Sequence, residues 1–193
     1  NPALLITGGT GSFGKAFTKY LLENTKWTIR IFSRDELKQA EMEDELGYNN
    51  RLRFLIGDIR DISRLRLAFR DVDFVVHAAA LKRVDSAEYN PMEVVNTNII
   101  GTQNVISACL DENVKKVLLL STDKAVLPVN LYGSTKLVAE KLFIQANIFA
   151  RSGYPKFSIV RYGNVMGSRG SVVHAFKQQA KSGLLKITHT SMT

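Results

Sequence analysis

A glycine-rich turn near the N-terminus constrains the fold of this chain more than any other feature. In the segment LLITGGTGSFGKAF, an apolar run is followed at once by three regularly spaced glycines and then by a helical pattern. A diphosphate needs close backbone approach and N–H groups at a helix N-terminus, and residues without side chains permit both. We therefore expect a strand, a dinucleotide-binding turn and a helix. The expected cofactor contacts in this turn are Gly8, Thr10, Gly11, Ser12, Phe13 and Gly14.

Apolar runs and helical patterns alternate along the chain to about residue 162. Several runs, such as VLLLS at 117–121, are continuously apolar, which is typical of parallel strands with helices on both faces of the sheet. Strands are expected at residues 4–7, 28–33, 53–56, 74–77, 116–121 and 157–161. Helices are expected at residues 13–24, 35–46, 62–69, 91–112, 132–150 and 172–182. This order predicts an α/β fold with a doubly wound parallel sheet of the Rossmann type.

Two boundaries follow from the same pattern. Asn90 stands before Pro91 and is expected to cap the helix that begins there. The alternation fades after residue 163, so residues 1–163 are expected to form an NADP-binding domain that also carries the catalytic residues. Residues 164–193 are expected to begin a substrate-binding lobe, most of which is absent from this chain.

The composition favours a soluble, cytoplasmic domain that binds small anionic ligands. No apolar run approaches the roughly 20 residues of a membrane-spanning helix, so no membrane partner is expected. The net charge of +8 is interleaved with acidic residues, as in SRDELKQAEMEDE, which argues against nucleic-acid binding. The single cysteine, Cys109, is expected to be a buried structural residue, and no metal site is expected.

The end of the second strand distinguishes between two cofactors. An NAD site normally presents an acidic residue there to the ribose 2′-hydroxyl, whereas this chain has Ser33 and Arg34. Arg34 is suited to a 2′-phosphate, with Ser33 and Lys38 as further donors, which favours NADP over NAD. The alternative is that Arg34 pairs on the surface with Asp35 or Glu36.

Two further segments are expected to line the cofactor site. In GDIRD, Asp58 and Ile59 follow the third strand, where an adenine edge is met. In HAAA, small residues after the fourth strand allow the backbone to approach the cofactor, and His77 is expected to be a satisfied core histidine. The small residues of this segment are Ala78, Ala79 and Ala80.

Tyr132 and Lys136 are the expected catalytic pair. They are four residues apart in a helical pattern, so their side chains fall on one face about one turn apart. A phenol is a poor base at neutral pH, but a neighbouring ammonium and the positive nicotinamide are expected to lower its pKa, so that Tyr132 takes a proton while hydride leaves for the cofactor. Thr122, ten residues earlier at the end of the fifth strand, completes the set.

Together these motifs identify a family resemblance over essentially the whole chain. TGGTGSFG, GDIRD, HAAA and YGSTK, in this order, resemble extended short-chain dehydrogenases/reductases. SRDELKQ, AAALKRV, AEYNP, STDKA, NLYGSTK and RYGNVMGSRGSV resemble more closely the soluble, inverting UDP-N-acetylglucosamine 4,6-dehydratases of the pseudaminic acid pathway. Sugar dehydratases of the dTDP-glucose type carry Thr-Asp-Glu where this chain has Thr122, Asp123 and Lys124, which favours the inverting subgroup.

The resemblance implies a lyase that acts on UDP-N-acetylglucosamine in glycan biosynthesis. Tyr132 assists oxidation at C4 of the sugar, and NADP accepts the hydride. Lys124 then removes the C5 proton while Asp123 protonates the departing C6 hydroxyl. The hydride returns to C6, and protonation of C5 from the opposite face inverts that centre.

The Asp123–Lys124 pair raises a physical question, because a base must be neutral and an acid protonated. The neutral pair and the ion pair hold the same number of protons, so burial on substrate binding favours the neutral form. Both side chains can serve one site only if the strand ends by Thr122, because adjacent residues in a strand point to opposite faces. The alternative is a solvated surface ion pair.

Weaker assignments and competing functions complete the expectations. The resemblance implies that Lys82, Asn164 and Arg169 contact the substrate and that the protein is a homo-oligomer. Arg161 is expected to be a sugar or diphosphate contact or a structural ion-pair partner, and His174 to lie at a surface or interface. The alternatives are an NADP-dependent sugar epimerase of the same fold, a retaining dehydratase, and a non-catalytic NADP sensor. The epimerase would use Tyr132 and Lys136 without the acid–lysine pair.

Overall fold

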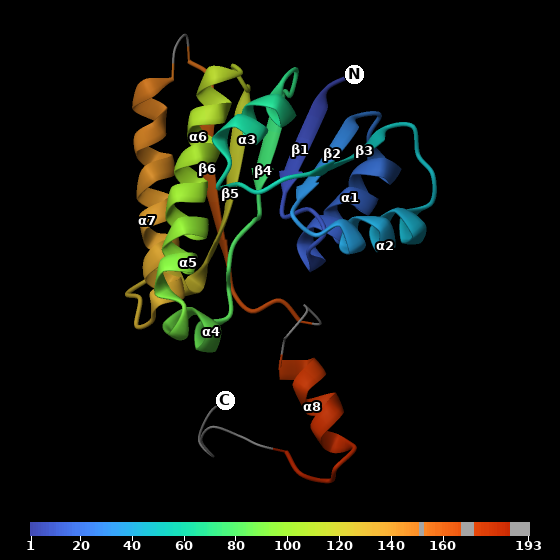
Figure 1. The fold of residues 1–193 in the computed structure, drawn as a ribbon, viewed down its shortest axis with the longest axis vertical. Helices are drawn as coiled ribbons and strands as arrows, with labels where there is room; N and C mark the ends of the chain where they lie inside the picture. Colours follow the sequence, from blue (N-terminus) through green and yellow to red (C-terminus); the bar gives the residue numbers. More distant parts are fainter. Residues whose placement is uncertain (151–152, 167–171, 186–193) are drawn as a thin grey trace. The chain divides into compact units, whose positions relative to one another are not determined.

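Six parallel strands form one sheet in the order β3-β2-β1-β4-β5-β6 (Figure 1). The computed structural model describes residues 1–150, 153–166 and 172–185. The strands are β1 (Ala3–Thr7), β2 (Thr28–Ser33), β3 (Leu52–Ile56), β4 (Phe74–His77), β5 (Lys116–Thr122) and β6 (Lys156–Tyr162). Each predicted strand is confirmed to within one residue at either end. The order reverses between β1 and β4, which is where a doubly wound sheet binds its ligand.

Helices connect the strands. They are α1 (Ser12–Asn24), α2 (Glu36–Leu46), α3 (Ile62–Phe69), α4 (Val84–Tyr89), α5 (Pro91–Val95), α6 (Gly101–Asp111), α7 (Leu131–Ala146) and α8 (Val172–Ala180). A π-helical turn, η1 (Asn96–Ile100), joins α5 to α6, and 3₁₀ turns η2 (Asp123–Ala125) and η3 (Asn147–Phe149) flank α7. The Rossmann-type α/β fold is thereby confirmed.

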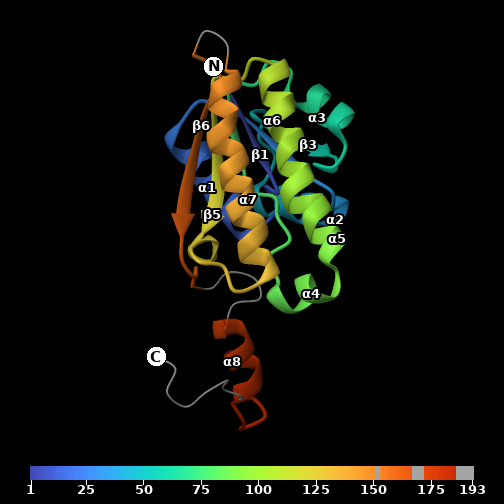
Figure 2. The ribbon, with the colours of Figure 1, turned by 90° about the vertical axis from the view of Figure 1, so that its left-hand side faces the viewer.

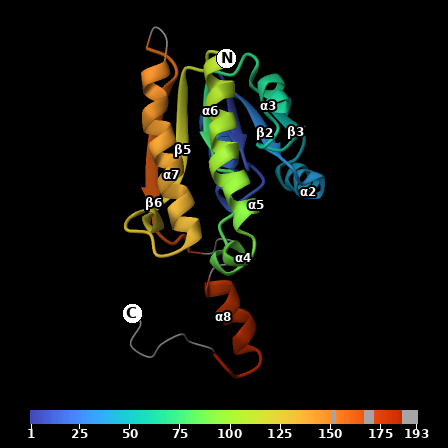
Figure 3. The ribbon, with the colours of Figure 1, turned by 60° about the vertical axis from the view of Figure 1, so that its left-hand side comes forward.

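Helices cover both faces of the sheet, which explains the continuously apolar strands. On one face α3, α6 and α7 pack over a core that includes Leu5, Phe69 and Phe143. On the other face α1 and α2 pack over a core that includes Ile6 and Met42. The helices α6 and α7 lie side by side on the first face (Figure 2 and Figure 3). Because Leu5 and Ile6 are neighbours in β1, the strand contributes alternately to the two cores.

Polar caps fix where several helices begin. The side chain of Asp35 accepts a hydrogen bond from the Lys38 backbone N–H at the start of α2. Asn130 accepts in the same way from the Gly133 N–H at the start of α7. Each cap satisfies an N–H group that has no partner within the helix, so α2 and α7 each start at a defined residue.

The predicted helix 91–112 needs a correction. The π-helical turn η1 interrupts it, and α4, a six-residue helix, precedes it without having been predicted. Asn90 does precede Pro91, but its side chain makes no cap; its Nδ2 donates instead to the Ser86 carbonyl of α4 at 3.0 Å. Neither feature has a 3.6-residue apolar repeat long enough to be recognised. The helices predicted to end at residues 150 and 182 end at Ala146 and Ala180.

The chain divides into two compact units, Asn1–Gly163 and Asn164–Thr193, the second of which contains α8. That the first binds a nucleotide and the second a substrate stays a prediction. Cys109 is fully buried in the first unit, and burial raises the pKa of its thiol well above the ordinary value, as expected for a structural cysteine. In the part of the chain that the structure describes, no helix has the length and hydropathy of a membrane span.

Candidate active site

The glycine-rich turn between β1 and α1 is packed too tightly for side chains. Gly8 has φ of +66°, and a Cβ there would lie 2.7 Å from the Cα of Ala79. A Cβ on Gly14 would lie 2.1 Å from the Gly9 carbonyl oxygen. Glycine at these two positions therefore lets the turn approach the loop after β4 and lets α1 start directly behind it.

The N-terminus of α1 has the donors that a diphosphate requires. Its N-cap is Gly11, which has no side chain to occupy the first N–H groups, and its first turn contains no acidic residue. Ser12 and Phe13 are exposed beside it, and Thr10 is buried in the turn. The positive end of the helix dipole thus faces a region lined by backbone, an arrangement that fits the diphosphate of a dinucleotide.

The expected 2′-phosphate donors lie together where β2 ends and α2 begins. Ser33 is buried, and its Oγ accepts a hydrogen bond from Gln39 Nε2 at 2.9 Å. Lys38 Nζ forms an ion pair with Asp35. Arg34 is half exposed, and its Nη1 lies 3.5 Å from Asp58 Oδ2, an acid of the loop after β3.

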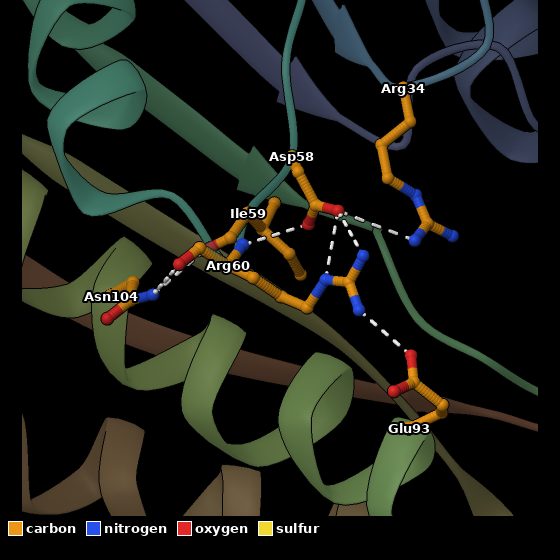
Figure 4. A network of polar contacts seen from close by, with 6 residues as sticks. All are labelled: Arg34, Asp58, Ile59, Arg60, Glu93 and Asn104. Atoms are coloured by element: carbon orange, nitrogen blue, oxygen red, sulfur yellow. Dashed lines mark hydrogen bonds and ion pairs between the residues drawn. The ribbon is translucent and has the colours of Figure 1, made fainter. Parts of the chain in front are cut away.

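Asp58 and Ile59 occupy the loop after β3 (Figure 4). Burial raises the pKa of the Asp58 carboxyl, but hydrogen bonds from Arg60 and the charge of Arg34 outweigh burial, so its pKa is lowered. The Ile59 side chain is buried in the core, and its carbonyl oxygen accepts from Asn104 Nδ2 at 3.1 Å. Ile59 can therefore offer a cofactor only backbone atoms, whereas Asp58 offers a carboxylate.

Ala78 and Ala79, after β4, lie against Gly8 of the glycine turn; that they contact a cofactor stays a prediction. The N–H of Ala78 donates to the Thr7 carbonyl at 3.1 Å, and that of Ala79 to Thr7 Oγ1 at 3.3 Å. His77 is confirmed as a satisfied core histidine: its Nδ1 lies 2.7 Å from Thr7 Oγ1 and its Nε2 lies 3.0 Å from Thr102 Oγ1. Burial, and secondarily the charge of Lys136, lowers its pKa to about 3, so the ring is neutral.

The strand β5 ends at Thr122, which meets the geometric condition for the Asp123–Lys124 pair. The next residues form the η2 turn, and Lys124 Nζ lies 3.2 Å from Asp123 Oδ1. Thr122 Oγ1 also donates to Asp123 Oδ1 at 2.9 Å. Hydrogen bonds from Thr122 and then Lys124 lower the pKa of Asp123, and both charged side chains are more than one third exposed. In this structure the pair is a solvent-exposed ion pair.

Tyr132 and Lys136 project from the first turns of α7 but meet different partners. Lys136 is 4% exposed, its Nζ donates to the Leu120 carbonyl of β5 at 2.7 Å, and burial lowers its pKa to about 8. Burial raises the pKa of Tyr132, although a hydrogen bond with Thr122 opposes that shift. Burial of the phenol prevails and the Lys136 ammonium is directed at a carbonyl, so the pKa of Tyr132 is not lowered here; that Lys136 and a bound nicotinamide together lower it stays a prediction.

Sequence reasoning missed the buried acid behind this pair. Glu140 is 3% exposed, one turn after Lys136, and Arg161 of β6 donates to both of its carboxylate oxygens, at 2.8 and 2.6 Å. Ser121 Oγ also donates to Glu140. The role of Arg161 as a structural ion-pair partner is confirmed. The i, i+4 spacing of Lys136 and Glu140 was a signal that could have found this acid.

A buried asparagine joins the loop after β4 to α7. Asn98 Oδ1 accepts from the Leu81 N–H at 2.8 Å, and its Nδ2 donates to the Leu81 carbonyl at 2.9 Å and to Thr135 Oγ1 at 3.1 Å. Because Asn98 lies in η1, the π-helical turn places an amide between two elements of the site. No residue spacing in the sequence predicts this contact.

The assigned substrate contacts are divided between the two units. Lys82 lies exposed in the loop after β4, within the first unit. Asn164 belongs to the second unit, Arg169 lies outside the described residues, and so does the side chain of His174. Within residues 1–150, 153–166 and 172–185, no group of His, Cys, Asp and Glu is arranged to hold a metal ion.

The doubly wound sheet, the glycine turn and the tyrosine–lysine helix define an extended short-chain dehydrogenase/reductase. The chain belongs to the polysaccharide biosynthesis protein family, whose model matches residues 4–193. It is 60% identical over 193 residues to the inverting UDP-N-acetylglucosamine 4,6-dehydratase of Campylobacter jejuni subsp. jejuni serotype O:23/36 (strain 81-176), covering 98% of this chain and 58% of that protein. The family resemblance seen in the motifs is thus confirmed.

Two further relatives broaden the comparison. A UDP-glucose 4-epimerase of Rickettsia akari (strain Hartford) is 50% identical over 195 residues, covering 98% of this chain and 57% of that protein. The X-ray structure of Pen from Bacillus thuringiensis matches with a TM-score of 0.88 and 45% identity, over 93% of this chain and 57% of that chain. The chain therefore spans less than three fifths of the length of these relatives.

Proposed function

We propose that this protein is an NADP-dependent 4,6-dehydratase that acts on UDP-N-acetylglucosamine with inversion at C5. The observation that carries the proposal is the Asp123–Lys124 ion pair directly after β5, linked through Thr122 to Tyr132. The 60% identity to a curated inverting dehydratase supports the same reaction. Identity alone would not distinguish a dehydratase from an epimerase, whereas elimination needs an acid and a base at C6 and C5 and C4 epimerisation does not.

Positive charge after β2 supports NADP as the cofactor. β2 ends at Ser33 and Arg34 follows it, and the Asp58 carboxylate beside Arg34 is already hydrogen-bonded to Arg60. When bound, the nicotinamide would accept a hydride from the sugar and later return it. The residues assigned to hold the dinucleotide are Gly8, Thr10, Gly11, Ser12, Phe13, Gly14, Ser33, Arg34, Lys38, Asp58, Ile59, Ala78, Ala79, Ala80, Tyr132 and Lys136.

Tyr132 receives the proton of the C4 hydroxyl in this proposal. A hydrogen bond between Tyr132 and Thr122 opposes the rise in pKa that burial causes. Lys136 is anchored on the Leu120 carbonyl one helical turn away. The buried ammonium holds positive charge on the same side of α7, where it favours a phenolate that forms during the reaction.

Lys124 and Asp123 then perform the elimination. A proton must first move from Lys124 Nζ to the Asp123 carboxylate, across a contact of 3.2 Å. Both side chains are exposed here, and a bound sugar would displace the water around them, which disfavours both charges. Neutral Lys124 removes the C5 proton, and protonated Asp123 delivers a proton to the C6 hydroxyl as it leaves as water.

A sugar epimerase is the second candidate, and one observation favours it. The Rickettsia akari relative is a UDP-glucose 4-epimerase at 50% identity. That reaction would use Tyr132 and Lys136 but would give Asp123 and Lys124 no role. The two functions therefore differ in whether Lys124 is needed.

Proton NMR of the full-length protein with UDP-N-acetylglucosamine in deuterated water, without added reductant, distinguishes them. Dehydration produces a C6 methyl group with deuterium at C5 and an inverted ring, whereas a C4 epimer without a methyl group would establish the epimerase.

Lys124→Ala should abolish C5 exchange and leave cofactor binding intact. Lys115→Ala removes another aspartate-paired lysine at the other end of β5 and should keep the wild-type rate. Near wild-type dehydration by Lys124→Ala would show that Lys124 is not the base.

A further inference from the structure

Two arginines share the carboxylate of Asp58 unequally (Figure 4). Arg60 donates three hydrogen bonds to it: its backbone N–H to Oδ1 at 2.9 Å, its Nε to Oδ2 at 2.9 Å and its Nη2 to Oδ2 at 2.7 Å. Arg34 reaches Oδ2 only through Nη1, at 3.5 Å. Arg60 thus satisfies the carboxylate, and the contact of Arg34 lies beyond the usual range for an N–H···O hydrogen bond.

Arg60 is held in this position from two sides. Its Nη1 donates to Glu93 Oε2 of α5 at 2.9 Å. Asn104 of α6 donates from Nδ2 to the carbonyls of Ile59 and Arg60, at 3.1 and 3.0 Å. The loop after β3 is therefore fixed by its backbone and by an ion pair, so the guanidinium of Arg60 stays on Asp58.

Removal of Arg60 would change what Arg34 does. The Asp58 carboxylate would lose its bidentate partner, and Arg34 is the cation already beside it. The attraction between unit charges at 3–4 Å is large enough at a protein surface to close a 3.5 Å contact into a direct pair. The planar fork of Arg34 would then face a carboxylate instead of a ligand phosphate.

We propose that Arg60 is a positioning residue that neutralises Asp58, keeps Arg34 available for the 2′-phosphate and so sets the preference for NADP over NAD. The inference rests on the proposed function, in which NADP is the cofactor. Without Arg60, one positive charge fewer would stand beside Asp58 and the 2′-phosphate, which weakens the attraction for the dianionic phosphate of NADP, whereas NAD has a neutral hydroxyl at that position. Both consequences act through Asp58 and weaken the binding of NADP selectively.

The experiment measures the dissociation constants of NADP⁺ and NAD⁺ for the full-length protein by titration calorimetry at constant ionic strength. Arg60→Gln should weaken NADP⁺ binding about fivefold and change NAD⁺ binding by less than about twofold. Arg60→Lys retains the charge on Asp58 and should restore most of the selectivity. Arg66→Gln is the matched control, because it removes an arginine paired with another aspartate, Asp111, at 2.8 Å, and should change neither constant.

A double-mutant cycle tests whether Arg60 acts through Asp58. In an Asp58→Asn background, Arg60→Gln should no longer change the ratio of the two constants, although both cofactors bind more weakly there. Equal weakening of both cofactors by Arg60→Gln, or no weakening, would overturn the inference. Arg34→Ala separates this from the proposed function: if it affects NADP⁺ and NAD⁺ equally, the assignment of NADP itself fails, whatever Arg60 does.

Discussion

Two lysines twelve residues apart, Lys124 and Lys136, stand in contrasting environments at the same end of the sheet. Lys136 is buried on α7, bound to a backbone carbonyl, with its pKa lowered to about 8 by burial. Lys124 is exposed in the η2 turn and paired with Asp123 at 3.2 Å. The comparison shows that burial by the fold lowers the pKa of one lysine, whereas the other remains exposed; in the proposed reaction a bound sugar would have to exclude water from it.

The largest expected effect is the loss of the buried lysine. Lys136→Met should reduce turnover at least about 100-fold, because the ammonium that favours the Tyr132 phenolate is gone. Lys141→Met, on the exposed side of the same helix, is the control and should retain the wild-type rate. Steady-state kinetics of the full-length protein measures both, and a Lys136→Met rate close to wild type would remove Lys136 from the catalytic set.

A smaller effect is expected from the acid behind Lys136. Glu140→Gln should lower the free energy of unfolding by about 2 kcal/mol, because a nearly buried carboxylate loses its bidentate pairing with Arg161. Chemical denaturation measures this difference. Glu41→Gln, an exposed glutamate of α2, serves as the control and should have little effect.

The pH dependence of that difference has a defined sign. The hydrogen bonds from Arg161, opposed by burial, lower the pKa of Glu140 in the folded state. A carboxyl group whose pKa is lowered by folding stabilises the folded state at pH values above its unfolded-state pKa of about 4.3. This stabilisation is lost as the pH falls through the folded-state pKa. The difference between wild type and Glu140→Gln should hold between about pH 5 and 7 and shrink below about pH 4. A difference that grows on acidification would contradict the pairing.

The smallest effect on stability is expected at the exposed pair of Asp123 and Lys124. Asp123→Asn should shift the melting temperature by no more than about 1 °C, because a solvent-exposed ion pair contributes little to stability. Turnover should nevertheless fall strongly if Asp123 is the acid of the elimination. Differential scanning calorimetry and the NMR assay on the same variant separate the two. A large loss of stability would mean that the pair is structural.

The strands and most helices could be predicted because their signals are local. β2 and β4 match their expected bounds, since each is rich in β-branched and aromatic residues and ends at a polar residue. The π-helical turn around Asn98 could not be predicted, because its backbone departs from the 3.6-residue repeat on which pattern recognition depends. The pairing of Glu140 with Arg161 joins residues 21 positions apart on different elements, so it has no local pattern.

The sequence by itself determined the alternating order of strands and helices, the glycine turn and the one-turn spacing of Tyr132 and Lys136. These properties depend on side-chain size and on apolar repeats of two or 3.6 residues, both of which can be read directly from the amino-acid sequence. Only the tertiary structure decided which charges are buried and what they face. Whether a lysine meets a carbonyl, as Lys136 does, or an aspartate in water, as Lys124 does, follows from how distant elements pack, and the dielectric environment that packing creates sets each pKa.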